Sequence, residues 1–413
     1  MATATIGTRR NEAFWLTLLL ALFIVINYVD RGAVGIAGPK LKQELALNHE
    51  QFGLALSAFA WIYAPAQFFV GWLTSRICVY RLLAGGLMLW ALATFATGFV
   101  GGLAALVTLR VLLGIGEGVA FPCASKVIAE HVPASRRGIA NGMLAFALGL
   151  GPALGTFVGG LILAYFGWRP IFWLFGVVTL LWLVPWQSAS KPFWKTAEHA
   201  RAEMPISFSR LIRKRGAWTM GVAHFANTYP FYFLLAWLPL YLTENRGFTI
   251  IEMTGVTTVV YLLQAGFAPF WGWLSDWLVA RGGDEATVRR GFVMLYQFVV
   301  GAAVVTAGLA QSHSLLIAAL FTAGAFGGIG GQVSYQISQM FAGKSSGAWV
   351  GVVNGIGNTS GIVMPLLTGW AIETSGGSYL AAFLVSGAIS FAAILWWILV
   401  VPKIEPDPEL HPA

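Results

Sequence analysis

The 413-residue sequence is 57% hydrophobic and only 10% charged, whereas a typical soluble domain carries about 25% charged residues. This composition excludes a soluble globular fold, because such a fold could not bury so much apolar surface. The formal net charge of +8 and the pI near 9.6 would fit a nucleic-acid partner, but the distribution of the charges along the chain gives another explanation.

Apolar runs of about 20 residues, the length that crosses a hydrocarbon core about 30 Å thick, recur along the whole chain. The first six predicted spans are residues 14–37, 51–75, 81–100, 103–126, 136–163 and 168–188. The second six are residues 216–243, 251–277, 288–310, 313–340, 345–373 and 378–402. The sequence therefore predicts an all-α membrane protein with twelve transmembrane helices.

The twelve predicted spans divide into two groups of six. The string Gly-Trp-Leu-Thr-Ser-Arg at 71–76 ends the second span, and Gly-Trp-Leu-Ser-Asp-Trp at 272–277 ends the second span of the later group. This internal repeat predicts an N-terminal half at 1–189 and a C-terminal half at 216–402, the layout of a major facilitator fold. A polar linker at 190–215 joins the halves, and residues 403–413 form a cytoplasmic tail.

Basic residues fall mostly on one side of the predicted membrane. With the N-terminus in the cytoplasm, the other side receives only Lys40, Lys42, Arg169 and Arg246. This asymmetry follows the positive-inside rule, in which cytoplasmic loops carry an excess of Lys and Arg. The net positive charge is therefore explained by the membrane topology, which argues against a nucleic-acid partner. We expect a multi-pass, monomeric protein of the bacterial inner membrane, with both termini cytoplasmic and the lipid bilayer as its surroundings.

Motifs for enzymatic chemistry and for cofactors are not found in the sequence. The two cysteines, Cys78 and Cys123, lack metal-ligand spacing, and no phosphate-binding loop, HExxH string or nucleophile elbow occurs. We therefore expect no enzyme activity, no cofactor and no metal site.

Four ionisable side chains lie inside predicted spans of the first half, where a charge costs about 2.5–3.5 kcal/mol at a helix centre. They are Asp30 and Arg31 in the first span and Arg110 and Glu117 in the fourth. Arg110 and Glu117 are seven residues apart, which places them on one helix face about 10 Å apart along the axis. Both can therefore face one cavity.

These four charges allow two interpretations. They can be a compensated ion-pair group that only joins helices. Alternatively, the arginines bind an anion, because a guanidinium binds carboxylate through two parallel hydrogen bonds and keeps its proton, while the acids exchange protons. Adding one proton to the neutral quartet leaves a net positive charge, so proton and anion binding would support each other.

The second half offers mainly neutral polar side chains within its spans, which suit the hydroxyl groups of a substrate or hydrogen bonds between helices. They include Asn227, Tyr229, Tyr232, Tyr261, Gln264, Gln332, Tyr335, Gln336, Asn354 and Asn358. His224, the ionisable exception, is expected to be a packing residue near a helix end.

Four stretches resemble the anion:cation symporter family of the major facilitator superfamily. They are NYVDR at 27–31, FAWIY at 59–63 with Gln67, RVLLGIGEGVAFP at 110–122 and WLPLYL at 237–242. The resemblance implies that Arg31 and Arg110 bind carboxylate and that Asp30 and Glu117 carry protons. It also implies that Tyr28, Tyr63, Gln264 and Asn358 line the site, to which we add Tyr229 and Tyr335 as candidate substrate-binding residues.

The sequence thus predicts proton-coupled symport of a small organic anion into the cell by alternating access. A sugar acid (hexonate, hexarate or hexuronate) is the favoured substrate. The alternatives are an aromatic or short-chain carboxylate, a drug/proton antiporter, an anion channel, or a receptor that has lost transport.

Overall fold

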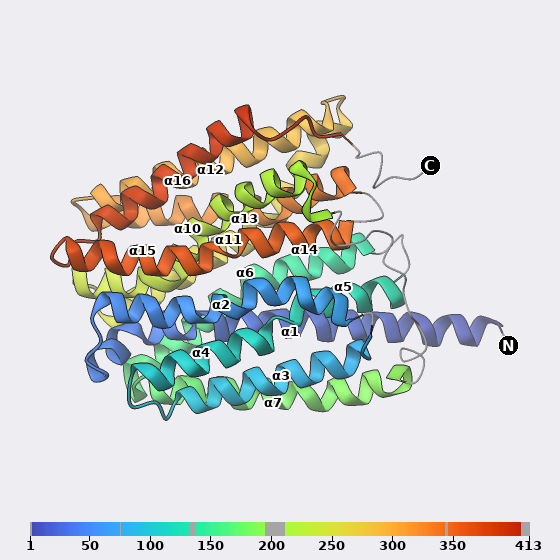
Figure 1. Ribbon diagram of the computed structural model, residues 1–413, viewed down its shortest axis with the longest axis horizontal. Coiled ribbons are helices and arrows are strands. Elements are labelled where there is room, and N and C mark those ends of the chain that lie inside the picture. Colours follow the sequence, from blue (N-terminus) through green and yellow to red (C-terminus); the bar gives the residue numbers. More distant parts are fainter. Residues whose placement is uncertain (1, 75, 133–136, 195–210, 343–345, 406–413) are drawn as a thin grey trace.

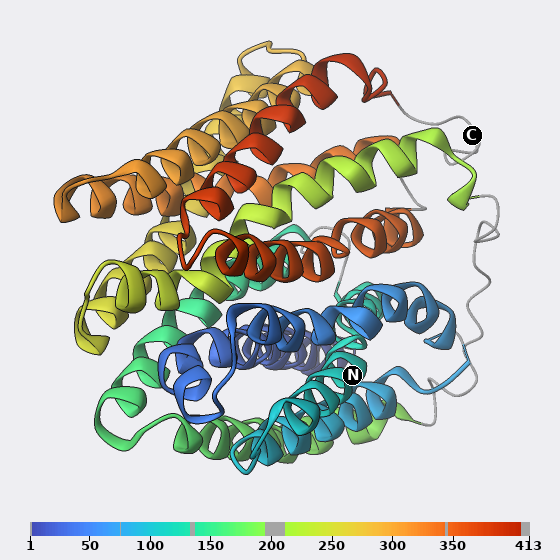
Figure 2. The same cartoon turned by 60° about the vertical axis from the view of Figure 1, so that its left-hand side comes forward.

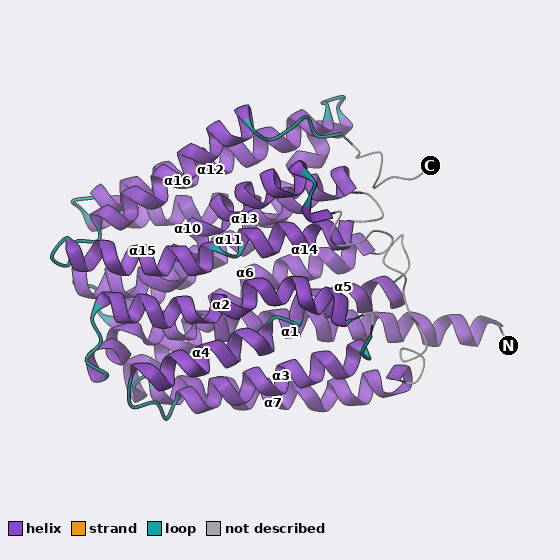
Figure 3. Cartoon of the chain, viewed as in Figure 1, coloured by secondary structure: helices purple, strands orange, loops and turns teal. Residues whose placement is uncertain are grey.

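The computed structural model describes all residues except 1, 75, 133–136, 195–210, 343–345 and 406–413. Over these described parts the chain is built from helices, turns and loops, without any strand (Figure 3). The helices run roughly parallel along the long axis of the molecule (Figure 1). The all-α prediction is confirmed.

The helices of the first half occupy the lower part of Figure 1, and those of the second half the upper part. The first set comprises α1 (Ala2–Glu44), α2 (His49–Leu73), α3 (Val79–Thr97), α4 (Leu103–Glu117), α5 (Ala120–His131), α6 (Arg137–Phe166), α7 (Arg169–Ser190) and the short 3₁₀ helix η2 (Lys191–Phe193). The second set comprises α10 (Arg215–Leu240), the π-helical turn η3 (Tyr241–Asn245), α11 (Ile250–Ala280), α12 (Glu285–Leu309), α13 (His313–Ala342), α14 (Ser346–Gly357), α15 (Ser360–Thr374) and α16 (Leu380–Leu399). Most of the predicted linker and tail lies outside the described residues.

Ten stretches of the described chain are long and apolar enough to cross a membrane. The helices α2 and α10, with 25 and 26 residues, are also long enough to cross and complete the twelve predicted spans. Large apolar side chains point outward along the bundle, with Phe166 and Leu399 at 75% and 76% exposure. Such a surface is stable only against lipid, so the chain is a multi-pass membrane protein.

Two of the twelve spans are broken near their middle. Span four consists of α4 and α5, which are separated at Gly118 and Val119, and span eleven consists of α14 and α15, separated at Asn358 and Thr359. The backbone at Gly118, Val119 and Thr359 keeps right-handed helical dihedral angles, so each break is a local turn within one continuous span. A local departure from the α-helical hydrogen-bond pattern inside a long helix often marks a functional hinge, so both turns are candidates for a functional site.

The two halves meet along α1, α2 and α6 on one side and α10, α11, α14 and α15 on the other, as the turned view in Figure 2 also shows. The backbones approach closely where α1 crosses α10. A Cβ at Gly35 would lie 2.5 Å from the carbonyl oxygen of Leu235, so only glycine permits this crossing. Gly35 also lies at the edge of the cavity between the halves.

A polar network joins the two halves at the end of the bundle where α1 ends and α2 begins. Lys42 and His49 contribute from the first half, and both contact Glu244 of η3, at 3.0 and 3.2 Å. His49 also contacts Glu373 at 3.2 Å, and Tyr379 donates to Glu244 at 2.9 Å. Burial alone would raise the pKa of Glu244, but the hydrogen bonds from His49, Lys42 and Tyr379 outweigh it and lower the pKa to about 2. Glu244 is therefore ionised at neutral pH and helps to hold this end closed.

Candidate functional site

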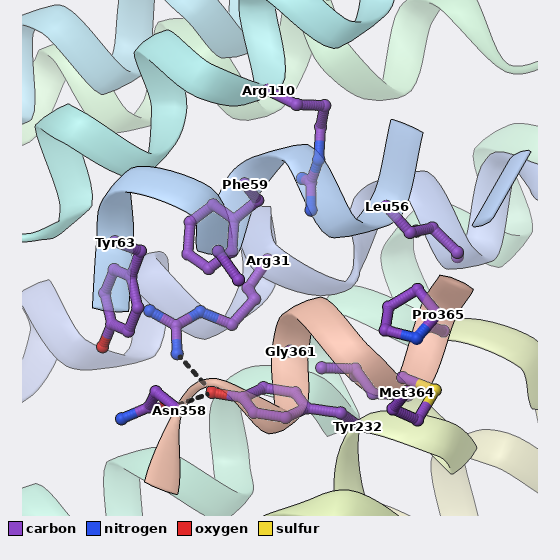
Figure 4. Close-up of a pocket in the computed structure, with 14 residues that line it drawn as sticks. Arg31, Leu56, Phe59, Tyr63, Arg110, Tyr232, Asn358, Gly361, Met364 and Pro365 are labelled. Atoms are coloured by element: carbon purple, nitrogen blue, oxygen red, sulfur yellow. Dashed lines mark hydrogen bonds between the residues drawn. The ribbon is translucent and has the colours of Figure 1, made fainter. Parts of the chain in front are cut away.

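A cavity of about 40 Å³ lies between the halves, beside the break in span eleven. Five helices supply its walls: α1, α2 and α4 from the first half, and α10 and α15 from the second, together with Asn358 at the break. The lining residues are Arg31, Gly35, Leu56, Phe59, Ala60, Tyr63, Arg110, Tyr232, Leu235, Ala236, Asn358, Gly361, Met364 and Pro365 (Figure 4). The structure thus brings both predicted arginines to one cavity.

Arg31 is held by a hydrogen-bond partner at each of its donor groups. Its Nε and Nη2 donate to Oε2 of Glu117 at 3.1 and 2.7 Å, and Nη2 also donates to Asn27 Oδ1 at 3.3 Å. Its Nη1 donates to the hydroxyl oxygens of Tyr28 and Tyr232, at 3.4 and 3.5 Å. Tyr232 lies on α10, so this one guanidinium links Glu117 in the first half to the second half (Figure 4).

Aromatic rings enclose the same guanidinium. Its central carbon lies 4.6 Å from the ring centre of Tyr28, 4.6 Å from that of Tyr63 and 5.0 Å from that of Phe59. A ring face attracts a cation, so these contacts favour the charged arginine in its buried position. Tyr28 is thereby placed beside Arg31, although it does not line the cavity itself.

Glu117 is the last residue of α4 and is fully buried next to the break in span four. Its Oε2 carries both bonds from Arg31, whereas Oε1 makes no hydrogen bond within the described residues. The neighbouring helix positions the pair: a Cβ at Gly114 would lie 2.2 Å from the carbonyl oxygen of Phe59, so glycine lets α4 pack directly on α2. Glu117 therefore has one oxygen bound to Arg31 and one oxygen available to take a proton.

Arg110 differs from Arg31 because it has no ionic partner in the part of the chain that the structure describes. Its Nε and Nη1 are buried without a hydrogen bond, although the residue is only 4% exposed. Its guanidinium carbon lies 5.1 Å from the ring centre of Phe59, and the charge of Glu117 acts on it without a salt bridge. A buried, unpaired cation is unfavourable unless an anion accompanies it, so Arg110 is the strongest candidate ligand for a bound anion.

Asp30 forms no salt bridge with Arg31 or Arg110 within the described residues, although the charge of Glu117 acts on it. Its Oδ2 accepts hydrogen bonds from Trp90 on α3 at 2.5 Å and from Thr179 on α7 at 2.9 Å, so the carboxyl group faces the interior of the first half. Consecutive positions on a helix point about 100° apart, which is why Asp30 and Arg31 cannot share one face. The expected quartet is thus an ion pair, one unpaired arginine and one separate acid.

The structure places some of the predicted neutral substrate-binding residues at the cavity and others away from it. Tyr63 and Asn358 line the cavity. Gln264 and Tyr229 are not among the lining residues: Gln264 packs against α13 at Gly327, and Tyr229 is 1% exposed within the core. The side chain of Tyr335 lies outside the described residues.

Sequence reasoning did not assign Tyr232 to the site, although its hydroxyl connects Arg31 to Asn358, to which it donates at 2.7 Å. It also missed the apolar lining from Leu56, Met364 and Pro365. Tyr232 is one of many polar residues in the second half, so its type alone carried little information. The turn at Asn358, which places Asn358 beside the cavity and within reach of Tyr232, became visible only in the structure.

A metal site is not indicated by the residues that the structure describes. Among them no group of three or more His, Cys, Asp or Glu side chains could hold an ion. The residues that line the cavity offer guanidinium, phenol and amide groups beside apolar side chains.

Comparison with known proteins agrees with this architecture. A family model described as Major Facilitator Superfamily matches residues 20–283 and 256–413, and the chain belongs to this superfamily. A solved structure of a bacterial homologue of the human lysosomal transporter Spinster superposes with a TM-score of 0.73 at 17% identity, over 95% of this chain and 96% of that one, which shows the shared fold.

Curated relatives match over nearly the full length of the chain. The probable sulfoacetate transporter SauU of Cupriavidus necator is 29% identical over 94% of both chains. The hexuronate transporter of Bacillus subtilis is 27% identical over 95% of this chain and 96% of its own. The probable galactarate/D-glucarate transporter GudP of Escherichia coli is 26% identical over 98% and 96%. All three relatives are named as transporters of organic anions. The chain is therefore similar to the organic-anion transporters of the superfamily, as the motif resemblance predicted.

Proposed function

We propose that this chain carries a small organic anion into the cell together with protons. The observation that carries the proposal is the asymmetry of the two arginines in one cavity. Arg110 is buried without an ionic partner among the described residues, while Arg31 is paired with Glu117. The relatives named for sulfoacetate, hexuronate and galactarate, all of them anions, support this reading.

In the proposed mechanism, Arg110 binds the acidic group of the substrate first. A proton on Glu117 then weakens its pair with Arg31, and the Nε and Nη2 donors of Arg31 become available to the anion. Because Arg31 also bonds Tyr232 on α10, its release changes the contacts between the halves. Each proton therefore favours binding of the anion, and by linkage the anion favours binding of the proton.

Asp30 is proposed as a second proton-binding group in this scheme. Asp30 lies on α1, the helix that also carries Arg31. Its carboxyl group contacts Trp90 on α3 and Thr179 on α7. A change in its charge would act on the position of α1 and so on Arg31. Asp30→Asn is expected to alter coupling more than it alters the affinity for the anion.

Alternating access is proposed to occur by movement of the halves, residues 1–189 and 216–402, around the central cavity. The topology predicted from the basic residues places both termini in the cytoplasm of a bacterial cell and the chain in the inner membrane as a monomer. In this orientation the Lys42–Glu244 network lies on the outer side.

Two substrate classes remain for this proposal. The sugar acids predicted from the sequence match what two of the relatives are named for. A short or aromatic carboxylate is favoured by a different observation, the apolar lining that includes Leu56, Met364 and Pro365. A cationic drug is disfavoured because it would face the unpaired charge of Arg110.

Purified protein in liposomes tests the proposal. Labelled sulfoacetate, galactarate and hexuronate are offered with and without an inward proton gradient, and a cationic dye serves as the competing cargo. Accumulation of at least one anion above equilibrium, dependent on the gradient and lost in Arg110→Ala, is the expected result. Movement of the dye with no anion uptake would exclude organic-anion symport, and equilibration without accumulation would indicate a channel.

A further inference from the structure

The polar groups that face the cavity are largely engaged by other parts of the protein. The hydroxyl of Tyr232 accepts from Arg31 and donates to Oδ1 of Asn358 at 2.7 Å. Asn358 in turn donates through Nδ2 to the carbonyl oxygen of Asn354 at 2.8 Å. All the donors of Arg31 have protein partners as well. Within the described residues, the hydrogen-bonding capacity left for a substrate is mainly that of Arg110 and of the Tyr63 hydroxyl, which also lines the cavity.

Apart from the rings of Phe59 and Tyr63, the remaining wall is mainly aliphatic. Figure 4 shows Leu56 on the same side as Arg110, with Met364 and Pro365 on the side facing them. The aliphatic lining residues are Leu56, Ala60, Leu235, Ala236, Met364 and Pro365. These side chains bury apolar groups favourably, but they offer no donor or acceptor to a hydroxyl.

We propose that this cavity selects a compact anion whose body carries few or no hydroxyl groups. The carboxylate or sulfonate group binds Arg110, and the body packs against Leu56, Met364 and Pro365. The inference rests on the proposed function and names the substrate class of the same site.

Matched pairs of anions isolate the effect of hydroxyl groups. Butyrate and threonate have the same four carbons and the same carboxylate, and threonate adds three hydroxyls. Propane-1-sulfonate and 2,3-dihydroxypropane-1-sulfonate form a second pair, with a head group that stays ionised at all working pH values. Gluconate serves as the six-carbon sugar acid.

Isothermal titration of the purified full-length protein with these five compounds at one pH is the test. A hydroxyl that leaves water and finds no partner weakens binding, and discrimination of this kind reaches roughly 100-fold in apolar pockets. We expect butyrate and propane-1-sulfonate to bind at least tenfold more tightly than their hydroxylated partners, and gluconate to bind most weakly.

A matched pair of variants then tests the wall itself. Met364→Gln keeps the length of the side chain and adds an amide, whereas Met364→Leu keeps the wall apolar. Met364→Gln should reduce the preference for butyrate over threonate about tenfold, and Met364→Leu should leave it within twofold. Melting temperatures of both variants establish that they are folded, and the comparison of ligands on the unmodified protein does not depend on either variant.

The outcomes separate this inference from the proposed function. If threonate or gluconate binds as tightly as butyrate and Arg110→Ala abolishes that binding, the preference for a hydroxyl-poor body is wrong and organic-anion binding stands. If none of the five anions binds, or if Arg110→Ala leaves their affinities unchanged, both the inference and the proposed function are wrong.

Discussion

Replacement of Glu117 by glutamine tests whether its ion pair with Arg31 couples protons to the anion. In the structure, Nε and Nη2 of Arg31 both donate to one carboxylate oxygen, at 3.1 and 2.7 Å, and the two side chains are 3% and 0% exposed. Glutamine keeps an acceptor at that position but removes the charge. Glu117→Gln therefore imitates the protonated acid.

The magnitude follows from the two bonds. A hydrogen bond to a charged group contributes about 1.5–3 kcal/mol and a neutral one about 0.5–1.5 kcal/mol, so weakening both should lower the stability of the ligand-free protein by about 2 kcal/mol. The bound anion replaces the missing charge, so added substrate should restore most of this loss. The thermal shift caused by substrate is thus expected to be larger in Glu117→Gln than in the unmodified protein.

The pH dependence gives the sharper measurement. If binding of the anion requires a proton on Glu117, the dissociation constant of the unmodified protein rises towards tenfold per pH unit once the acid is ionised, which corresponds to about 1.4 kcal/mol per unit. In Glu117→Gln the dissociation constant should lose the part of its pH dependence that comes from Glu117 and keep only what Asp30 contributes. Exchange of labelled for unlabelled substrate should persist in liposomes, while accumulation driven by the proton gradient is lost.

Glu285→Gln is the matched control, since Glu285 also pairs with an arginine, Arg289 at 3.1 Å, but is 46% exposed and remote from the cavity. It should leave both the pH slope and the accumulation unchanged. Loss of exchange and accumulation to the same extent in Glu117→Gln, with the pH slope of binding retained, would refute coupling through this pair and favour a purely structural ion pair.

Three further predictions follow from the same structure. Arg110→Ala should weaken anion binding by about 2–5 kcal/mol, measured by titration, while the melting temperature of the ligand-free protein stays equal or rises because an unpaired buried charge is removed; unchanged affinity would mean that the anion binds elsewhere. Gly114→Ala should lower the melting temperature, because its Cβ would lie 2.2 Å from the backbone oxygen of Phe59, whereas Gly85→Ala, with no atom within 4 Å, should not; equal effects would contradict the close packing of α4 on α2. Glu244→Gln should destabilise the protein by about 1 kcal/mol at pH 7, since its side chain is 32% exposed. The pKa of Glu244 is lowered from its usual value of 4.5 to about 2, so its stabilising contribution is fully present above pH 4.5 and disappears as the pH falls towards 2. A stability difference between Glu244→Gln and the unmodified protein that persisted unchanged at pH 2 would contradict the ion-pair origin.

The sequence by itself determined that the chain lies in a membrane, how many spans it has and which four charges lie inside those spans. Spans follow from the length and apolarity of each run, which are local properties, and the structure places the break of span four within the predicted 103–126 segment. Arg110 and Glu117 were assigned to one helix face by their spacing alone. Arg31 was expected at the same site because the family resemblance implies that it binds carboxylate together with Arg110.

Only the tertiary structure decided which of these charges are partners. Each acid could have paired with either arginine, and the rotation of α1 turns Arg31 toward Glu117 and Asp30 toward Trp90 and Thr179. Which neutral side chains reach the cavity also depends on the rotation of each helix about its axis. Polar residues occur on many spans of the second half, and their type does not say which face points to the other half. The turn at Asn358 and the crossing of α10 over α1 bring Tyr232 to the cavity, while Gln264 faces α13. The sequence does not reveal these contacts because they arise between residues about 60 to 200 positions apart.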